Sequence, residues 1–171
     1  HGKIALRGRR LQHLRQVHRV NVGDTLRVGA GNGLIGEGKI LEINDEAAVL
    51  AVSLQQSPPA KLPLCLVLAL PRPKMLRRIL RSVAEFGVAE LHLINSFRVE
   101  KSYWQSPVLD AGSMRENLLQ GLEQSRDTRL PLVCCHRRFN PFVEDSLPRM
   151  VEKRRALLAH PGEYPPCPRD L

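Results

Sequence analysis

The residues from Leu64 to Phe86 constrain the fold of this chain most, because a strand pattern there runs directly into a helix pattern. Leu64–Leu70 is an unbroken apolar run of strand length, which suits a strand buried on both faces of a parallel sheet. Pro71-Arg72-Pro73 interrupts the run, and apolar residues then recur at helical spacing from Leu76 to Ala84. The sequence therefore predicts the first strand–helix unit of an α/β domain.

The outer face of this predicted helix and its entry loop are strongly basic. Five cations lie there with no acidic residue among them: Arg72, Lys74, Arg77, Arg78 and Arg81. A solvated basic face and a surface for an anionic ligand are both consistent with this pattern. The formal net charge of +9 argues for an acidic partner, with nucleic acid ahead of an anionic membrane surface.

Length and composition describe an ordinary globular chain. Its 171 residues suffice for one ordinary domain or two small ones. No apolar run approaches the roughly 20 residues that span a bilayer, and no signal-peptide pattern follows the first residues. We therefore expect a cytoplasmic protein without membrane contact. The chain begins with His1 rather than Met and ends soon after a proline-rich stretch, so we expect both ends to be cut.

The second half of the chain alternates strand and helix patterns. A parallel sheet with right-handed crossovers follows from this order. Helices are predicted at Lys74–Phe86, after a capping box at Ser113–Glu116, and at Pro141–Lys153. Strands are predicted at Leu64–Leu70, Val88–Asn95, Pro131–Cys135 and Ala156–Ala159.

The first half of the chain does not alternate between strand and helix patterns. A helix is predicted at Gly8–Val17, and short strands separated by turn residues favour a small barrel. The strands are expected at residues 2–6, 25–29, 34–44 and 47–54. The proline-containing stretch after them reads as a linker. We therefore predict a barrel domain at residues 1–56, a linker at 57–62 and an α/β domain at 63–171.

The barrel half carries a second basic cluster. Five arginines fall within 13 residues, and a solvated face would normally mix charge signs. Arginine also suits forked phosphate contacts. RNA contacts are therefore expected from Arg7, Arg9, Arg10, Arg15, His18 and Arg19.

Motifs for metal binding or nucleophilic hydrolysis are missing from the sequence. The four cysteines form no C-x-x-C pair, and no histidine lies at zinc-ligand spacing from two of them. We expect reduced, structural cysteines and no metal site, with Cys135-His136 as a weak hint of a nucleophile or metal ligand. Ligand sites of parallel sheets lie at the carboxyl ends of the strands. Those ends are predicted at Pro71–Lys74, Asn95–Lys101, His136–Arg138 and His160–Glu163.

Several motifs resemble one known family across essentially the whole chain. They are RQVHRVNVGD at Arg15–Asp24, the Lys74 helix followed by EFGV at Glu85–Val88, EQSR at Glu123–Arg126, and ALLAHPGE beginning at Ala156. Together they resemble the RsmE family, bacterial methyltransferases that modify N3 of a uridine in 16S ribosomal RNA. The resemblance implies a PUA-like barrel followed by a SPOUT domain, a trefoil knot that binds S-adenosylmethionine and usually dimerises.

The chain also departs from this family. The G-P-E-G-G and L-R-x-E-T-A segments of the cofactor pocket are absent, as is the first strand of the barrel. We therefore expect the C-terminal knot segment to be absent from this chain and the chain alone to be inactive.

The resemblance also assigns residues. Contacts to S-adenosylmethionine are implied for Leu158, His160, Pro161 and Gly162, with Glu163 a weaker candidate. RNA contacts at the sheet edge are expected from Arg72, Lys74, Arg98, Lys101 and Arg126. Tyr103 or Trp104 either stacks on a flipped uridine or packs in the core or a dimer interface. The sequence does not identify a general base.

Three functions are therefore distinguished. The first is S-adenosylmethionine-dependent methylation of uridine N3 in 16S ribosomal RNA, with the small ribosomal subunit as partner and a homodimer as the assembly. The alternative is a non-catalytic basic RNA-binding module with the barrel as its working part. A nucleotide-binding Rossmann protein is disfavoured, because no G-x-G-x-x-G follows a predicted strand.

Overall fold

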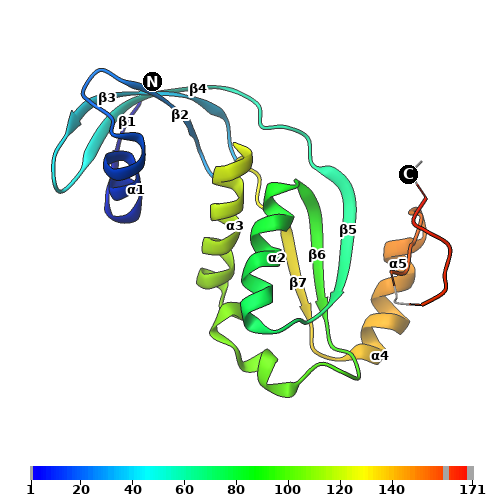
Figure 1. Cartoon of the computed structure of the whole chain (residues 1–171). Coiled ribbons are helices and arrows are strands. Elements are labelled where there is room, and N and C mark those ends of the chain that lie inside the picture. The colour runs from blue at the N-terminus through cyan, green and yellow to red at the C-terminus, as the bar shows by residue number, and fades with distance from the viewer. Residues whose placement is uncertain (1, 160–161, 169–171) are drawn as a thin grey trace.

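Figure 1 shows the computed structural model of the chain, which describes residues 2–159 and 162–168. Its strands form two separate sheets. The first is antiparallel with strand order β1-β4-β3-β2, and the second is parallel with order β5-β6-β7. We refer to residues 2–56 as the N-terminal lobe and to the chain from residue 62 onward as the C-terminal lobe.

The N-terminal lobe contains one short helix and four strands. Helix α1 (Gly8–His13) continues into a π-helical turn η1 (Leu14–His18). The strands are β1 (Gly2–Leu6), β2 (Thr25–Gly29), β3 (Ile35–Ile43) and β4 (Ala48–Gln56).

The helical segment packs on one face of this sheet. Leu11 and Leu14 form a buried cluster with Ile40, Ala48 and Leu50 of β3 and β4. β3 carries a bulge at Ile35/Gly36. A Cβ at Gly36 would lie 1.9 Å from the Ser53 carbonyl oxygen, so this position requires glycine.

The predicted barrel is not closed. Among the described residues, β1 pairs only with β4 and β2 only with β3, so both are edge strands. A barrel removes its edges by pairing the first and last strands at a fixed tilt. Here α1 and η1 cover the face that closure would enclose, and the sheet stays open.

The C-terminal lobe is the predicted parallel α/β unit. Its strands are β5 (Leu62–Ala69), β6 (Val88–Ile94) and β7 (Leu132–His136). Helices α2 (Pro73–Glu85) and α3 (Ala111–Ser125) lie together on one face of this sheet, which we call the helix face (Figure 1). The 3₁₀ turns η2 (Lys101–Gln105) and η3 (Pro107–Leu109) precede α3, while α4 (Phe139–Pro141), η4 (Phe142–Ser146) and α5 (Leu147–Val151) follow β7.

Apolar residues at the predicted spacing fill the interface between α2, α3 and the sheet. The cluster includes Leu76 and Leu80 of α2, Leu122 of α3, and Leu91 of β6. A Cβ at Gly121 would lie 2.2 Å from the Arg81 carbonyl, so glycine allows the two helices to approach closely. The strand–helix unit is therefore confirmed, and Gly87 ends it with φ +71°.

Three local predictions in this lobe are wrong. β5 is an edge strand in the described structure rather than one buried on both faces, and Leu62 and Leu64 are 49% and 48% exposed. Ala156–Ala159 is irregular rather than a strand, because no neighbouring strand pairs with it there. The capping box is not formed: α3 begins at Ala111, since η3 already turns the chain into the helix, and Ser113 lies inside the first turn.

The two lobes meet where the β2–β3 hairpin contacts the segment after α3. The backbone N–H of Asn32 donates to the Thr128 carbonyl at 2.7 Å, and Thr128 Oγ1 donates to the Gly33 carbonyl at 2.5 Å. The Leu130 N–H donates to Asn32 Oδ1 at 2.8 Å. β4 ends at Gln56 and β5 begins at Leu62, while the division into domains at 57–62 stays a prediction.

Candidate functional site

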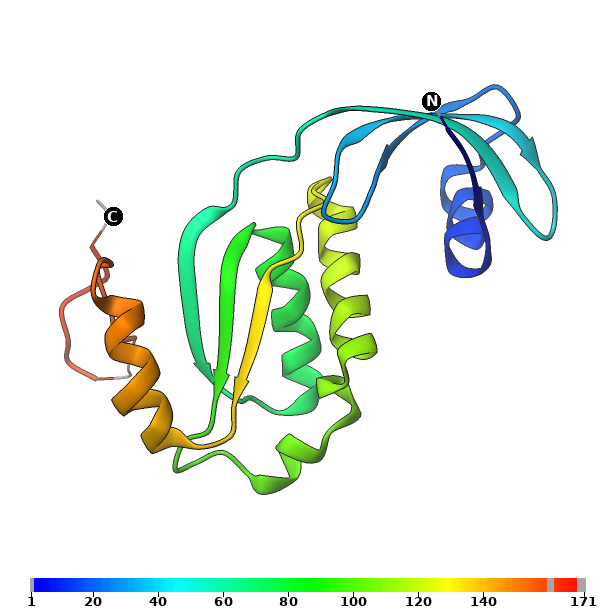
Figure 2. The same cartoon turned by 180° about the vertical axis from the view of Figure 1, so that it is seen from behind.

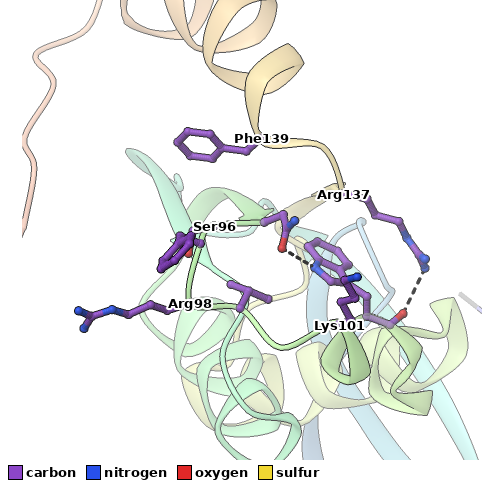
Figure 3. A pocket seen from close by; sticks show the side chains of 9 residues that line it. Ser96, Arg98, Lys101, Arg137 and Phe139 are labelled. Carbon is purple, nitrogen blue, oxygen red and sulfur yellow. Dashed lines mark hydrogen bonds between the residues drawn. The ribbon is translucent and has the colours of Figure 1, made fainter.

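An open cavity of about 860 Å³ lies beyond the carboxyl ends of the parallel strands. It has the volume of a small-ligand site, and it lies where parallel sheets place such sites. Figure 3 shows its lining side chains, which come from the segment after β6, from η2 and from the segment after β7. The lining residues are Asn95, Ser96, Phe97, Arg98, Val99, Lys101, Trp104, Arg137 and Phe139.

Trp104 is the fixed part of this cavity. Its side chain is buried, and Nε1 donates a hydrogen bond to Asn95 Oδ1 at 3.1 Å. The guanidinium carbon of Arg137 lies 5.6 Å from the centroid of the indole ring, within cation–π range. Arg137 Nη2 also donates to the Trp104 carbonyl at 3.3 Å (Figure 3). Trp104 therefore holds Arg137 at the cavity without neutralising its charge.

Three cations line the cavity: Arg98, Lys101 and Arg137. None of the nine lining residues is acidic. In Figure 3 the Arg98 side chain reaches away from Lys101 and Arg137, so the cations are spread around the opening. Cations that are spread over a surface suit a polyanion better than a single anionic group.

Two exposed aromatic rings complete the lining. Phe97 is fully exposed and Phe139 is 44% exposed. Exposed aromatics beside cations are typical of surfaces that stack single-stranded bases. The sequence placed Arg98 and Lys101 here, but Arg137, Phe97 and Phe139 were missed. Their positions in the sequence could have identified them, because all three follow the end of a predicted strand.

The other residues predicted at the sheet edge lie outside the lining. Arg72 precedes α2, and its Nε donates to the Tyr103 hydroxyl at 3.3 Å. Tyr103 in turn donates to Glu100 Oε1 at 2.9 Å, so its ring is held in this network. Lys74 is exposed on the first turn of α2. Arg126 is the C-cap of α3 and has a left-handed conformation, with φ 57°. It directly precedes the segment that contacts the N-terminal lobe.

The arginines of the N-terminal lobe divide into paired and unpaired groups. Arg9 forms two hydrogen bonds, 2.8 and 3.1 Å long, with the Glu123 carboxylate of α3. This hydrogen bonding raises the pKa of Arg9. Arg15 contacts Asp45 at 2.5 Å. Four other predicted RNA contacts are exposed on the same lobe, and the described part of the chain gives none of them a carboxylate partner: Arg7, Arg10, His18 and Arg19.

A shielded ion pair links Lys61, just before β5, to Asp127 after α3. We call this region, where the two lobes meet, the joint between the lobes. Lys61 Nζ contacts Asp127 Oδ2 at 2.8 Å, and both side chains are largely buried. Burial alone would raise the pKa of Asp127, but Lys61 and the N–H groups of Thr128 and Arg129 outweigh it and hold that pKa below its usual range.

The predicted cofactor residues that the structure describes lie outside the lining of the cavity. Leu158 is 91% exposed in an irregular segment, and neither Leu158 nor Gly162 lines the cavity. Glu163 is exposed beside Gly162. His160 and Pro161 lie outside the described residues. Among the described helices, none has the length and apolarity that crossing a bilayer requires.

Comparison with known proteins gives this geometry a context. The family model described as RNA methyltransferase domain matches residues 58–168. The chain is 35% identical over 132 residues to ribosomal RNA small subunit methyltransferase E of Treponema pallidum, which covers 76% of this chain and 49% of that protein. The chain therefore spans about half the length of this curated relative.

Solved structures share the fold at low sequence identity. One is ribosomal RNA small subunit methyltransferase E of Neisseria gonorrhoeae bound to S-adenosylmethionine, with a TM-score of 0.58 and 16% identity over 80% of this chain and 56% of that one. Another is a methyltransferase of Legionella pneumophila in complex with S-adenosylmethionine, with a TM-score of 0.59 and 16% identity over 85% and 61%.

The resemblance to RsmE proteins is thus confirmed by sequence and by fold. The family match extends from residue 58 through all three parallel strands, and so includes every residue that lines the cavity. The chain belongs to the RNA methyltransferase domain family.

Proposed function

We propose that this chain is part of an S-adenosylmethionine-dependent methyltransferase that modifies N3 of a uridine in 16S ribosomal RNA. The observation that carries the proposal is the cavity at the strand ends, where three cations and two exposed aromatic rings surround a buried tryptophan. Family membership supports the reaction class, and the name of the Treponema pallidum relative supports ribosomal RNA as substrate.

RNA would be held through its phosphates and through its target base. Arg98, Lys101 and Arg137 would contact phosphates around the target nucleotide, which gives affinity and salt dependence without base specificity. Phe97 or Phe139 would stack on the displaced uracil. Trp104 is buried beneath Arg137, so its role is to support this site rather than to stack on the base.

The N3 proton must leave the uracil during methylation. The nine described lining residues include no carboxylate and no imidazole, so none of them offers such a general base. Cations next to the uracil carbonyl oxygens would stabilise the charge that develops when N3 loses its proton. We assign this role to Lys101 and Arg137, while solvent accepts the proton.

S-adenosylmethionine would supply the electrophilic methyl group, and the predicted cofactor residues that the structure describes lie outside the cavity lining. Leu158 faces solvent, and a Cβ at Gly162 would lie 2.6 Å from the Tyr164 ring, so this ring occupies the approach to the glycine. Cofactor contacts of Leu158, His160, Pro161 and Gly162 therefore stay predictions. The residues that line the cavity would bind and orient the RNA.

The small ribosomal subunit is the proposed partner, the assembly is a homodimer and the location is the cytoplasm. The alternative of a non-catalytic RNA-binding module is not favoured, because the family match covers the C-terminal lobe, which such a module does not need.

Methyl transfer to the ribosomal subunit tests this proposal. The natural protein is incubated with unmodified small ribosomal subunits and labelled S-adenosylmethionine. The nucleosides are then separated. We expect label in 3-methyluridine alone. Label in another nucleoside would overturn the uridine assignment. Tight binding of S-adenosylmethionine by the 171-residue chain, measured calorimetrically, would overturn the account of its pocket.

A further inference from the structure

The face of the parallel sheet opposite α2 and α3 carries a cluster of polar side chains. Figure 2 views the molecule from this second face, with the strands in front of α2. Cys65 on β5 is paired with Glu90 on β6, and the two-residue period of a strand places His92 on the same face as Glu90. On β7, His136 is paired with Ile94 and therefore also belongs to this face.

Three metal-binding groups of this cluster lie close together. Donor atoms of Cys65, Glu90 and His92 all fall within 4.8 Å of one another. His92 Nε2 lies 3.5 Å from Glu90 Oε2, and His92 is only 7% exposed. Ligands around a tetrahedral Zn²⁺, bound at about 2.0 to 2.3 Å, are separated by roughly 3.5 Å. The histidine–carboxylate distance already matches this geometry.

Two neighbouring residues orient these groups. His92 Nδ1 lies 2.9 Å from His136 Nε2, and the two rings stack at a centroid distance of 5.2 Å. A histidine that binds metal through one ring nitrogen usually hydrogen-bonds through the other. Arg154 Nη2 holds Glu90 Oε1 at 2.8 Å, which leaves Oε2, the oxygen facing His92, for a metal ion.

We propose that Cys65 Sγ, Glu90 Oε2 and His92 Nε2 bind a Zn²⁺ ion, with water as the fourth ligand. A thiolate and an imidazole select a transition metal over Mg²⁺ or Ca²⁺. Two anionic ligands and the Arg154 cation surround the ion. Arg154 also interacts with the Cys65 thiol, and its side chain, which is 46% exposed, would move off the sulfur when the ion binds. The site is independent of the proposed methyl transfer.

The sequence could not reveal this site by motif spacing. Cys65 lies 25 positions before Glu90, whereas zinc motifs such as C-x-x-C place their ligands a few residues apart. Parallel pairing of β5 with β6 is what places them side by side. The prediction of no metal site followed from the linear pattern alone, and the zinc proposal departs from it.

Titration with Co²⁺, a spectroscopic substitute for Zn²⁺, tests the site. We expect one equivalent to produce intense tetrahedral visible bands and a thiolate-to-cobalt charge-transfer band, and Zn²⁺ to abolish both. Cys65→Ser should remove the charge-transfer band. Cys135→Ser is the matched control, because Cys135 lies on the same sheet but faces the other side, and it should leave the spectrum unchanged. Weak octahedral bands, or an unaltered spectrum in Cys65→Ser, would overturn the proposal.

X-ray absorption of the zinc-loaded wild-type protein tests the ligand set without a substitution. We expect one sulfur at about 2.3 Å and nitrogen or oxygen ligands at about 2.0 Å. A shell of nitrogen and oxygen only would contradict the assignment of Cys65. His136→Asn should lower Zn²⁺ affinity at least 10-fold through the lost hydrogen bond to His92, with near-ultraviolet circular dichroism to verify the fold. Unchanged affinity in a folded His136→Asn protein would exclude the orienting role of His136.

Discussion

The two arginine-rich surfaces of this molecule differ in how their charge is balanced. On α1 and η1, Arg9 and Arg15 are paired with the carboxylates of Glu123 and Asp45. At the cavity, Arg137 is held by the face and carbonyl of Trp104, and none of the nine described lining residues is acidic. A count of arginines in the sequence therefore overstates the charge available on the first surface. Charge is available for a polyanion where aromatic and backbone groups hold the cation.

The largest expected effect comes from the cavity. Replacing Arg98, Lys101 and Arg137 together by glutamine should weaken binding of single-stranded ribosomal RNA about 100-fold near 0.1 M salt, because about three phosphate contacts are lost. The slope of log affinity against log salt should become shallower by about 2. Fluorescence anisotropy across a salt series measures both quantities. An unchanged slope would mean that these three cations do not contact RNA phosphates. That result would contradict the difference between the two surfaces.

The joint between the lobes should show the next effect. Asp127→Asn keeps acceptors for the N–H groups of Thr128 and Arg129 but loses the charge opposite Lys61, so it should cost about 2 kcal/mol of unfolding free energy. Because folding lowers the pKa of Asp127, its contribution is present at neutral pH and is lost as pH falls through that lowered pKa. Urea denaturation at pH 7 and pH 3 measures the effect, which should shrink at the lower pH.

Asp45→Asn is the control for the joint, since it also removes one partner of an ion pair. Its carboxylate is 88% exposed, so the loss should be well below that of Asp127→Asn. Equal losses would mean that shielding of the Lys61–Asp127 pair does not matter.

A third prediction separates the two kinds of arginine on α1 and η1. Arg10→Gln with Arg19→Gln should weaken RNA binding about 20-fold, because both side chains are exposed and lack a carboxylate partner among the described residues. Arg9→Gln with Arg15→Gln removes the same formal charge and should change affinity less than twofold. Comparable losses in these two double variants, measured at one salt concentration, would show that pairing does not withhold arginines from RNA.

The smallest expected effect is on stability. Arg9→Gln breaks the exposed pair with Glu123 that joins the two lobes, and should cost about 0.5 kcal/mol. Equilibrium urea unfolding measures this, and Arg10→Gln provides a matched arginine for which the described part of the chain shows no carboxylate partner. A loss in Arg10→Gln as large as in Arg9→Gln would remove the structural role of the Arg9–Glu123 pair.

Local sequence patterns predicted the fold where contacts are local. The apolar spacing from Leu76 to Ala84 and the run before it predicted α2 and β5, because each pattern fits one period. Long-range pairing was not predictable. The open edges of β1 and β2, the exposed side of β5 and the irregular Ala156–Ala159 segment all depend on which strands find a partner.

The location of the candidate site was predictable from the sequence, but the set of residues that lines it was not. The rule that ligands bind at the carboxyl ends of parallel strands predicted the sheet edge where Arg98 and Lys101 line the cavity, while their contact with RNA stays a prediction. Arg137 was missed because its importance comes from its packing on Trp104, 33 positions away. Arg9 and Arg15 were predicted to contact RNA, and the carboxylates that pair with them are far away in the sequence.

Photo-crosslinking tests the central claim most directly, namely that the cavity at the strand ends receives the target nucleotide. The chain is mixed with a 16S ribosomal RNA fragment containing 4-thiouridine at the target position, irradiated, digested and examined by mass spectrometry. We expect crosslinks to peptides that contain Phe97 and Phe139. Crosslinks confined to α1 and η1, with none at either phenylalanine, would contradict the account.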